Sequence, residues 1–376
     1  MKVYLDNSAT TPLTTEVKEY IISQLERYGN PSSMYSLGYD VKREIETVRN
    51  NVAKFINGDP EKVIFTSSGS AANTLAIKGL QNDDNHRKVV CYSPTAHKSM
   101  IKASTSCPFS KRLEVDMFGE IRYDNLRSDL DKLSRMGFGM TPIVCVEVAN
   151  SEIGTINDIV KICKITHEYG GVVIADATGY IPTNKVNMED WNCIDYLTFS
   201  GHKLHALKGV GVLYQNSPIK LEPIIYGSQE NGLFAGTENV LGVCSLGKAV
   251  ENYDYSSITS EGRDYVYSYI INHIDNCFMV GACFLHRIPH NLYMYFQDVP
   301  GETLVALMDM NGVQISTGSA CASKDNTPSG TLMAIGMDSE SSRNCVRFTF
   351  SGNETKDELD YVCETLSMCI SQIRKR

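Results

Sequence analysis

The chain has 376 residues, enough for two domains, and its 42% hydrophobic and 21% charged residues are ordinary for a soluble globular protein. A formal net charge of -9 argues against nucleic acid or an anionic membrane surface as the main partner. The chain shows neither the apolar stretch of a secretory signal at its start nor a segment apolar for long enough to span a bilayer. Its twelve cysteines include no Cys-x-x-Cys pair, so we expect no zinc site, no disulfide framework and a cytoplasmic location.

Strand-like and helix-like segments alternate through the first part of the chain. An amphipathic helix is predicted by apolar residues at helical spacing, namely Val41, Ile45, Val48, Val52, Phe55 and Ile56. A strand at residues 62–66 runs through Ser68-Gly69-Ser70 into a helical segment that begins near Ala71. Further strands are predicted at residues 88–92, 142–148, 172–175, 196–199 and 210–214. This alternation predicts a large α/β domain at residues 12–253, built on a sheet with crossover helices.

The pattern changes after residue 253. A helix, a strand at residues 291–296, another helix and a strand at residues 347–350 follow one another. These elements predict a smaller α+β domain formed by residues 1–11 and 254–376.

Two strands end in the side chains that pyridoxal phosphate most needs. Lys203 follows an apolar strand, where burial would favour the neutral amine that forms an imine. Asp176 ends another strand, where open α/β sheets place their ligands, and a carboxylate there can keep a pyridine nitrogen protonated. The structural alternatives are a lysine that emerges into solvent and a buried aspartate that caps a loop. Lys208 competes with Lys203 for the same role.

Two further segments are candidates for the same site. The turn Ser68-Gly69-Ser70 joins a strand to a helix start, which is a natural phosphate site, although a plain serine N-cap has the same pattern. His97 follows the strand at residues 88–92, where an imidazole could stack on a cofactor ring and move protons. A lone histidine is more often an ordinary loop residue.

A cysteine and an arginine indicate the substrate chemistry. Cys321 lies among Gly, Ser and Ala residues, which predicts an accessible loop, although most cysteines are small buried hydrophobes. Arg347 is a cation in an apolar strand, where it would bind either a substrate carboxylate or a structural partner. With Lys203 and Asp176, these residues indicate an enzyme that handles sulfur with pyridoxal phosphate.

An ordered set of motifs carries a resemblance to a known family. The motifs are Tyr4-Leu5-Asp6-Asn7-Ser8-Ala9-Thr10-Thr11-Pro12, Gly29-Asn30-Pro31-Ser32-Ser33, Phe65-Thr66-Ser67, Glu152-Ile153-Gly154, Ser200-Gly201-His202-Lys203 and Gly318-Ser319-Ala320-Cys321. Over nearly its whole length the chain resembles cysteine desulfurases of the NifS/IscS type, in the class V aminotransferase group. That resemblance implies the fold-type I architecture, with a large, mostly parallel sheet that has helices on both faces.

The resemblance also implies a role for each matching position. Lys203 would bind the cofactor and move the proton, Asp176 would pair with the ring nitrogen, and His97 would stack on the ring. The other cofactor-binding positions would be Ser68, Gly69, Ser70, Ser151, Ser200, His202 and, across a homodimer interface, Thr237. Asn7 and Arg347 would bind the substrate, L-cysteine. Cys321 would take its sulfur as a persulfide, release alanine, and pass the sulfur to an iron–sulfur scaffold or tRNA-thiolation protein.

Several positions depart from the family pattern. Ser151 and Gly179 replace an asparagine and a glutamine that contact the same ring oxygen. Asn231 and Phe234 replace arginines. These departures leave open another pyridoxal phosphate reaction, such as selenocysteine lysis, β-elimination or transamination, or a weakened homologue that serves as a binding protein.

Overall fold

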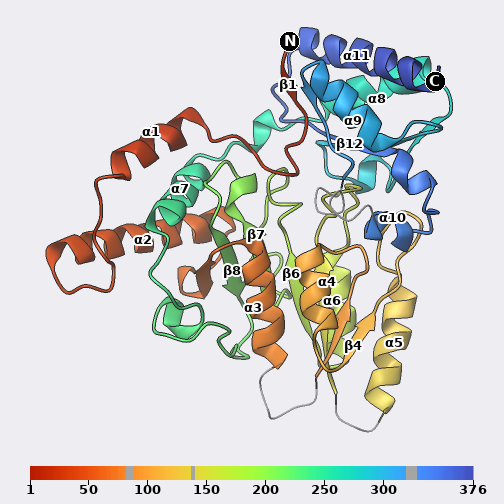
Figure 1. Ribbon diagram of the computed structural model, residues 1–376. Coiled ribbons are helices and arrows are strands. Elements are labelled where there is room, and N and C mark those ends of the chain that lie inside the picture. Colours follow the sequence, from red (N-terminus) through yellow and green to blue (C-terminus); the bar gives the residue numbers. More distant parts are fainter. Residues whose placement is uncertain (82–87, 137–139, 319–327, 376) are drawn as a thin grey trace.

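The computed structural model describes residues 1–81, 88–136, 140–318 and 328–375, and a large sheet lies at its centre (Figure 1). The sheet has seven strands in the order β2-β8-β7-β6-β5-β3-β4. Their bounds are β2 Val63–Thr66, β3 Lys88–Tyr92, β4 Ser110–Arg112, β5 Thr141–Glu147, β6 Val172–Asp176, β7 Tyr196–Ser200 and β8 Gly211–Gln215. β8 runs antiparallel to both of its neighbours, β2 and β7, and the other described strand pairs are parallel, so the predicted mostly parallel sheet is confirmed.

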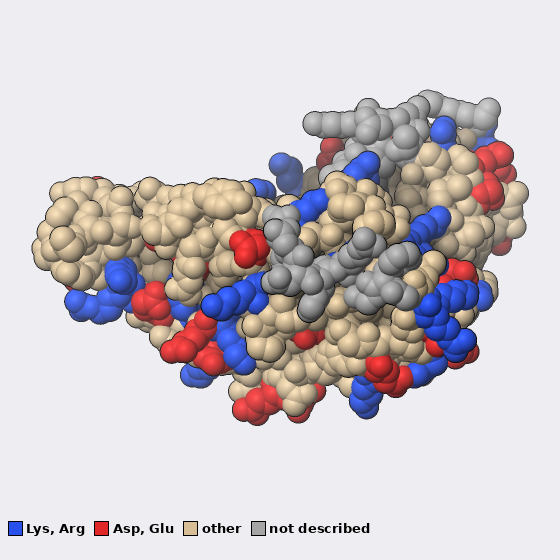
Figure 2. All heavy atoms as spheres, turned by 90° about the horizontal axis from the view of Figure 1, so that it is seen from below, with Lys and Arg blue, Asp and Glu red and all other residues tan. Residues whose placement is uncertain are grey.

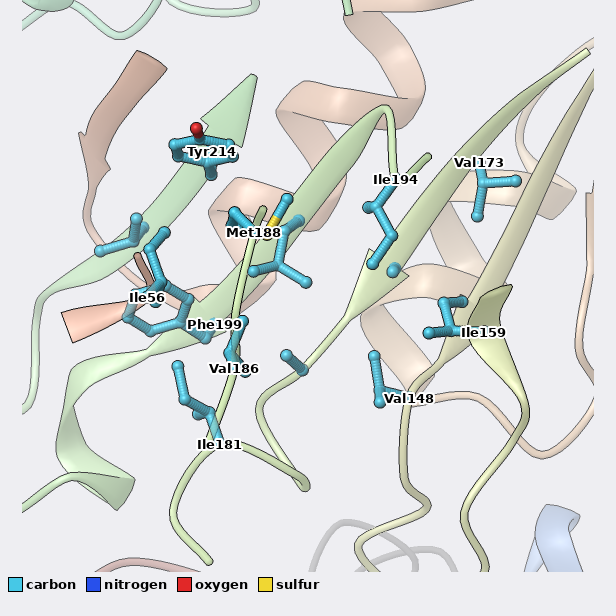
Figure 3. Close-up of a cluster of buried hydrophobic side chains, with 14 of the residues drawn as sticks. Ile56, Val148, Ile159, Val173, Ile181, Val186, Met188, Ile194, Phe199 and Tyr214 are labelled. Carbon is cyan, nitrogen blue, oxygen red and sulfur yellow. The ribbon is translucent and has the colours of Figure 1, made fainter. Parts of the chain in front are cut away.

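Helices cover both faces of this sheet because its central strands are buried on both sides. Val144 and Val146 pack into one apolar cluster, and the alternate residues Ile143 and Cys145 pack into another on the opposite face. Figure 3 shows part of the first cluster, where Ile56 and Tyr214 lie near Phe199. The helices on the first face are α2 Ser36–Phe55, α5 Tyr123–Arg135, α6 Ile159–Glu168 and α7 Val240–Glu251, and those on the second are α3 Gly69–Gln81 and α4 Lys98–Thr105.

The amino-terminal strand and the carboxyl-terminal part of the chain form a smaller α+β unit with its own apolar cluster. In it β1 (Val3–Tyr4) pairs with β11 (Val313–Gln314), and β10 (Asn291–Phe296) lies between β12 (Cys345–Thr349) and β9 (Cys277–Met279). Its helices are α8 Glu261–His273, α9 Gly301–Met310, α10 Gly330–Ala334 and α11 Lys356–Arg374. The separate apolar clusters support the proposed division near residues 12 and 253, which stays a prediction.

Most predicted elements lie close to where the pattern placed them. The strands at residues 88–92 and 291–296 have the predicted bounds, whereas the helix expected from Ala71 begins earlier, at Gly69. The short edge strand β4 was not predicted, because its residues Ser110, Lys111 and Arg112 are all polar. Among the described residues, no helix is both long and apolar enough to cross a membrane.

Candidate active site

The carboxyl ends of the central strands and the start of α3 surround a small cavity. It is lined by Ser68, Gly69, Ser70, Asn73, His97, Glu147, Ser151, Asp176, Thr178, Gly179, Ser200, His202 and Lys203. The structure therefore brings together most of the predicted cofactor-binding residues. A second cavity, of about 520 Å³, shares Thr178, Gly179 and Lys203 with the first and extends toward the small unit. Lys203 thus lies where the two cavities meet.

Lys203 ends a short 3-10 turn, η2 (Gly201–Lys203), directly after β7. Burial of the amine, reinforced by the Arg347 guanidinium, lowers its pKa, and Asp176 opposes the shift. A lowered pKa favours the neutral amine, which is the form that attacks a carbonyl carbon. Lys208 is exposed and lines neither cavity, so the geometry favours Lys203 over its competitor.

Asp176 is held in a fixed orientation at the end of β6, where 3% of its surface is exposed. The Asn73 side chain donates to Oδ2 at 2.7 Å, and the Thr178 main-chain N–H donates to Oδ1 at 2.9 Å. The Thr198 hydroxyl in turn donates to the side-chain oxygen of Asn73, Oδ1, at 2.5 Å. Sequence reasoning missed Asn73, although a buried amide on an otherwise apolar helix face was a signal for it.

The start of α3 forms one wall of the cavity. The Ala71 N–H donates to the Ser68 hydroxyl at 3.1 Å, so Ser68 is the serine N-cap of the structural alternative and also lines the cavity. A Cβ on Gly69 would lie 3.2 Å from Ser200 Cβ, which leaves little room for a side chain. With the hydroxyls of Ser70 and Ser200, the exposed N–H groups of this helix end suit a phosphate.

Two histidines border the cavity, and the pKa of each is lowered. His97 caps α4, and its Nδ1 accepts from the Ser99 N–H at 3.2 Å, which leaves the proton of the neutral ring on Nε2. Desolvation lowers the pKa of His97, opposed by Asp176 and helped by Lys203. Burial lowers the pKa of His202 to about 4, and its Nδ1 lies 3.1 Å from the Thr10 hydroxyl.

Asn7 and His290 line the second, larger cavity. The Asn7 side chain donates to the Thr349 carbonyl at 2.8 Å, which attaches the amino-terminal segment to β12. His290 Nε2 lies 3.3 Å from the Ser8 hydroxyl, and its buried Nδ1 has no hydrogen-bond partner among the described residues. Burial, followed by repulsion from Arg347, lowers the pKa of His290 to about 3. Sequence reasoning missed His290.

Arg347 forms the structural ion pair that was the alternative to substrate binding. Its guanidinium lies 2.6 Å from Asp6 Oδ1, and it donates to the Ser151 carbonyl at 2.9 Å and the Gly318 carbonyl at 3.0 Å. It lines neither cavity, and its buried Nε has no partner among the described residues. Binding of a substrate carboxylate by Arg347 stays a prediction.

The remaining expected residues either lie away from both cavities or fall outside the described residues. Cys321 lies outside the described residues. Thr237 is exposed on the loop before α7 and lines neither cavity of this chain. At Gly179 a Cβ would lie 2.4 Å from the Ala149 carbonyl oxygen, so this backbone has no room for the family's glutamine. Ser151 does line the small cavity that contains Asp176 and Lys203.

The donor set fits pyridoxal phosphate. A lysine with a lowered pKa, a fixed buried carboxylate and a helix start with serine hydroxyls share one cavity. No cluster of His, Cys, Asp and Glu able to hold a metal ion occurs in the described part of the chain.

Comparisons with known proteins agree with this arrangement. The family model described as aminotransferase class-V matches residues 3–362. A cysteine desulfurase IscS of Dictyoglomus turgidum is 36% identical, with 99% of this chain and 95% of that protein covered. One of Clostridium botulinum strain Hall is 33% identical, covering 100% of this chain and 96% of that protein. A solved NifS-like protein superposes with a TM-score of 0.88 at 26% identity, over 99% of this chain and 100% of the other. The structure titled "SspA in complex with cysteine" has a TM-score of 0.80 at 24% identity, over 94% and 100% of the two chains.

Proposed function

Because the chain belongs to the class-V aminotransferase family, we propose that it is a cysteine desulfurase that uses pyridoxal phosphate to convert L-cysteine to L-alanine. The observation that carries the proposal is the meeting of Lys203, Asp176 and the start of α3 in one cavity. The full-length relatives named cysteine desulfurase support the reaction and the substrate.

Residues of the large sheet would hold the cofactor. Ser70, Ser200 and the start of α3 would bind its phosphate, Asp176 would pair with its ring nitrogen, and His97 would cover its ring. When bound, the cofactor supplies an electron sink for the substrate α-carbon, which weakens the carbon–sulfur bond. The Asn73 and Thr178 donors keep the Asp176 carboxylate facing one way, so no reorganisation is required on binding.

Lys203 and Cys321 would carry the chemical steps. The Lys203 amine would take a proton from the substrate α-carbon and later return a proton to the product. The Cys321 thiolate would attack the substrate sulfur, so that an S–S bond forms as the carbon–sulfur bond breaks. The persulfide would stay on Cys321 while alanine leaves, and Asn7 and Arg347 would hold the substrate carboxylate.

A homodimer is part of the proposal. Helix α1 (Thr15–Gln24) and the start of α2 lie on an arm that projects from the body of the molecule (Figure 1). The arm exposes large apolar side chains, among them Tyr28 at 83% and Met34 at 87%, and its end has few charged atoms in Figure 2. A patch of this kind favours contact with a second copy of the chain. Thr237 of such a copy would complete the phosphate site.

The sulfur acceptor would be a protein of iron–sulfur cluster assembly or tRNA thiolation, in the cytoplasm. Transfer to a thiol of that protein requires only that the acceptor thiolate attack the outer sulfur of the persulfide. The overall acidity of the chain agrees with a protein rather than a nucleic acid as the direct partner.

The test is alanine release from L-cysteine in the presence of a reductant. We expect release by the native protein, loss of it in Cys321→Ala, and no change in the control Cys283→Ala, because Cys283 is an exposed thiol that lines neither cavity. Alanine at the native rate from Cys321→Ala would contradict the role of Cys321. No alanine from a native protein that is yellow with bound cofactor would contradict the activity itself.

A further inference from the structure

Glu147 is a buried carboxyl group in the cofactor cavity to which the proposed reaction gives no role. It ends β5 as Asp176 ends β6, and the two residues are direct partners in the parallel sheet. Partners in parallel strands project to the same face of a sheet. Both side chains therefore enter the same cavity, where the exposed fraction is 6% for Glu147 and 3% for Asp176.

The surroundings of the two carboxyl groups differ. Asp176 accepts from Asn73 and from the Thr178 main chain, one donor for each carboxylate oxygen. Glu147 Oε2 accepts from Asn150 Nδ2 at 3.0 Å, and the main chain of His97 contributes a hydrogen bond.

Asn150 connects Glu147 to the segment that carries His97. Its Nδ2 also donates to the Thr95 carbonyl at 2.7 Å, so Glu147 and Asn150 together hold the turn that presents His97 to the cavity. The charged groups that act on Glu147 are Asp176 from β6, which repels its anion, and Lys203 after β7, which attracts it.

We propose that Glu147 and Asp176 hold one proton between them, carried by Glu147, so that the cofactor ring meets a single negative charge and a His97 segment held in place. This inference rests on the proposed cofactor site. It gives Glu147 two roles beside that site: the residue would hold a proton, and it would position the His97 segment.

Electrostatics favours this distribution of the proton. Two neighbouring buried carboxyl groups do not both ionise, because each charge lacks solvation and repels the other. Burial, followed by the charge of Asp176, raises the pKa of Glu147 well above its usual range, whereas Lys203 and the Asn150 and His97 hydrogen bonds oppose the rise. Each Asp176 oxygen accepts from an N–H donor, whereas the Asn150 side chain donates to Oε2 of Glu147.

The protonation state is tested directly by infrared spectroscopy of the holoenzyme at neutral pH. We expect one component of the protonated-carboxyl C=O stretch in the native protein to be lost in Glu147→Gln and kept in Glu152→Gln. Glu152→Gln is the matched control, because Glu152 is another buried carboxyl whose pKa is raised by burial. Identical spectra in this region for the native protein and Glu147→Gln would overturn the proposal.

A pH titration of the visible band of the Lys203-bound cofactor is the second test. If Glu147 is neutral, Glu147→Gln removes no charge, and the midpoint should stay within about 0.3 pH units of the native value. If Glu147 were charged in the native protein, Glu147→Gln would lower the titration midpoint by about 1 pH unit or more. That result would also overturn the proposal.

The positioning role is tested by cofactor affinity. Glu147→Leu removes the acceptor for Asn150 and the His97 main chain, so we expect about tenfold weaker binding, whereas Glu147→Gln keeps a carbonyl acceptor and binds more tightly than Glu147→Leu. Native affinity in Glu147→Leu would refute this role. None of these measurements requires turnover, so a protein that binds the cofactor without desulfurating cysteine would refute the proposed function and leave this inference standing.

Discussion

The proposed cofactor side and the proposed substrate side of the site are built in different ways. On the cofactor side, Asp176 and Lys203 follow neighbouring strands of one sheet, and Asn73 joins them from a helix packed on that sheet. On the substrate side, Asp6 and Arg347 meet although they are 341 residues apart in the chain. The first half of the site is therefore built on neighbouring strands of one sheet, and the second depends on the docking of the chain's amino-terminal segment on β12.

The largest expected effect lies on the cofactor side. Lys203→Ala removes the amine that we propose binds the cofactor and moves the proton, so we expect loss of the cofactor's imine absorbance and a fall in kcat of at least about a hundredfold. Lys208→Ala is the control, because Lys208 is exposed outside both cavities. Equal losses in the two variants would contradict the assignment of Lys203. Absorbance spectra and alanine release measure both outcomes.

The next effect tests whether the substrate side depends on its ion pair. Asp6→Asn leaves the Arg347 guanidinium, which is 3% exposed, without its anionic partner. Breaking a buried pair in this way should lower the free energy of unfolding by about 3 kcal/mol, as measured by chemical denaturation. Arg135→Ala, in an exposed pair with Asp131, should change it little. Similar losses in both variants would show that the Asp6–Arg347 pair is not special.

The same contrast explains how much of the site could be predicted from the sequence. Lys203 and Asp176 were predictable because each follows a buried strand, and the ends of parallel strands meet at one edge of a sheet. Glu147 ends a strand in the same way, but its proximity to Asp176 follows only from the pairing of β5 with β6. Periodicity along a chain does not specify which strands become neighbours.

Tertiary contacts were still less accessible to sequence reasoning. The choice for Arg347 between a substrate and a structural ion pair depended on whether Asp6, in the amino-terminal motif, reaches β12. The replacement of the family's glutamine by Gly179 could be read as the loss of a cofactor contact. In the structure it accompanies the close approach of the Ala149 carbonyl, which is a property of the backbone.

A substitution at Gly179 tests whether the backbone packing at this position requires glycine. In Gly179→Ala the new Cβ would lie 2.4 Å from the Ala149 carbonyl oxygen, so we expect a loss of about 2 kcal/mol in the free energy of unfolding. Gly330→Ala in α10 is the control, since among the described residues no atom beyond its chain neighbours and its own helix backbone lies within 4 Å of the added Cβ. If Gly179→Gln were as stable as the native protein and bound the cofactor more tightly, the departure would be a lost contact rather than a packing requirement.

The smallest effect concerns the segment that leads to Cys321. The Tyr293 hydroxyl lies 3.1 Å from Glu152 Oε1 and 3.0 Å from the Thr317 carbonyl oxygen. A hydroxyl has a single proton, so Tyr293 donates to one of these two oxygens at a time.

Tyr293→Phe removes both contacts from the chain just before Gly318. We expect it to lower the free energy of unfolding by about 1 kcal/mol and to slow alanine release while leaving the visible cofactor spectrum unchanged. The control is Tyr295→Phe, because that ring stacks on Phe278 and its hydroxyl has no hydrogen bond among the described residues. A changed cofactor spectrum in Tyr293→Phe would mean that the two sides of the site are coupled through Glu152, against the separation drawn above.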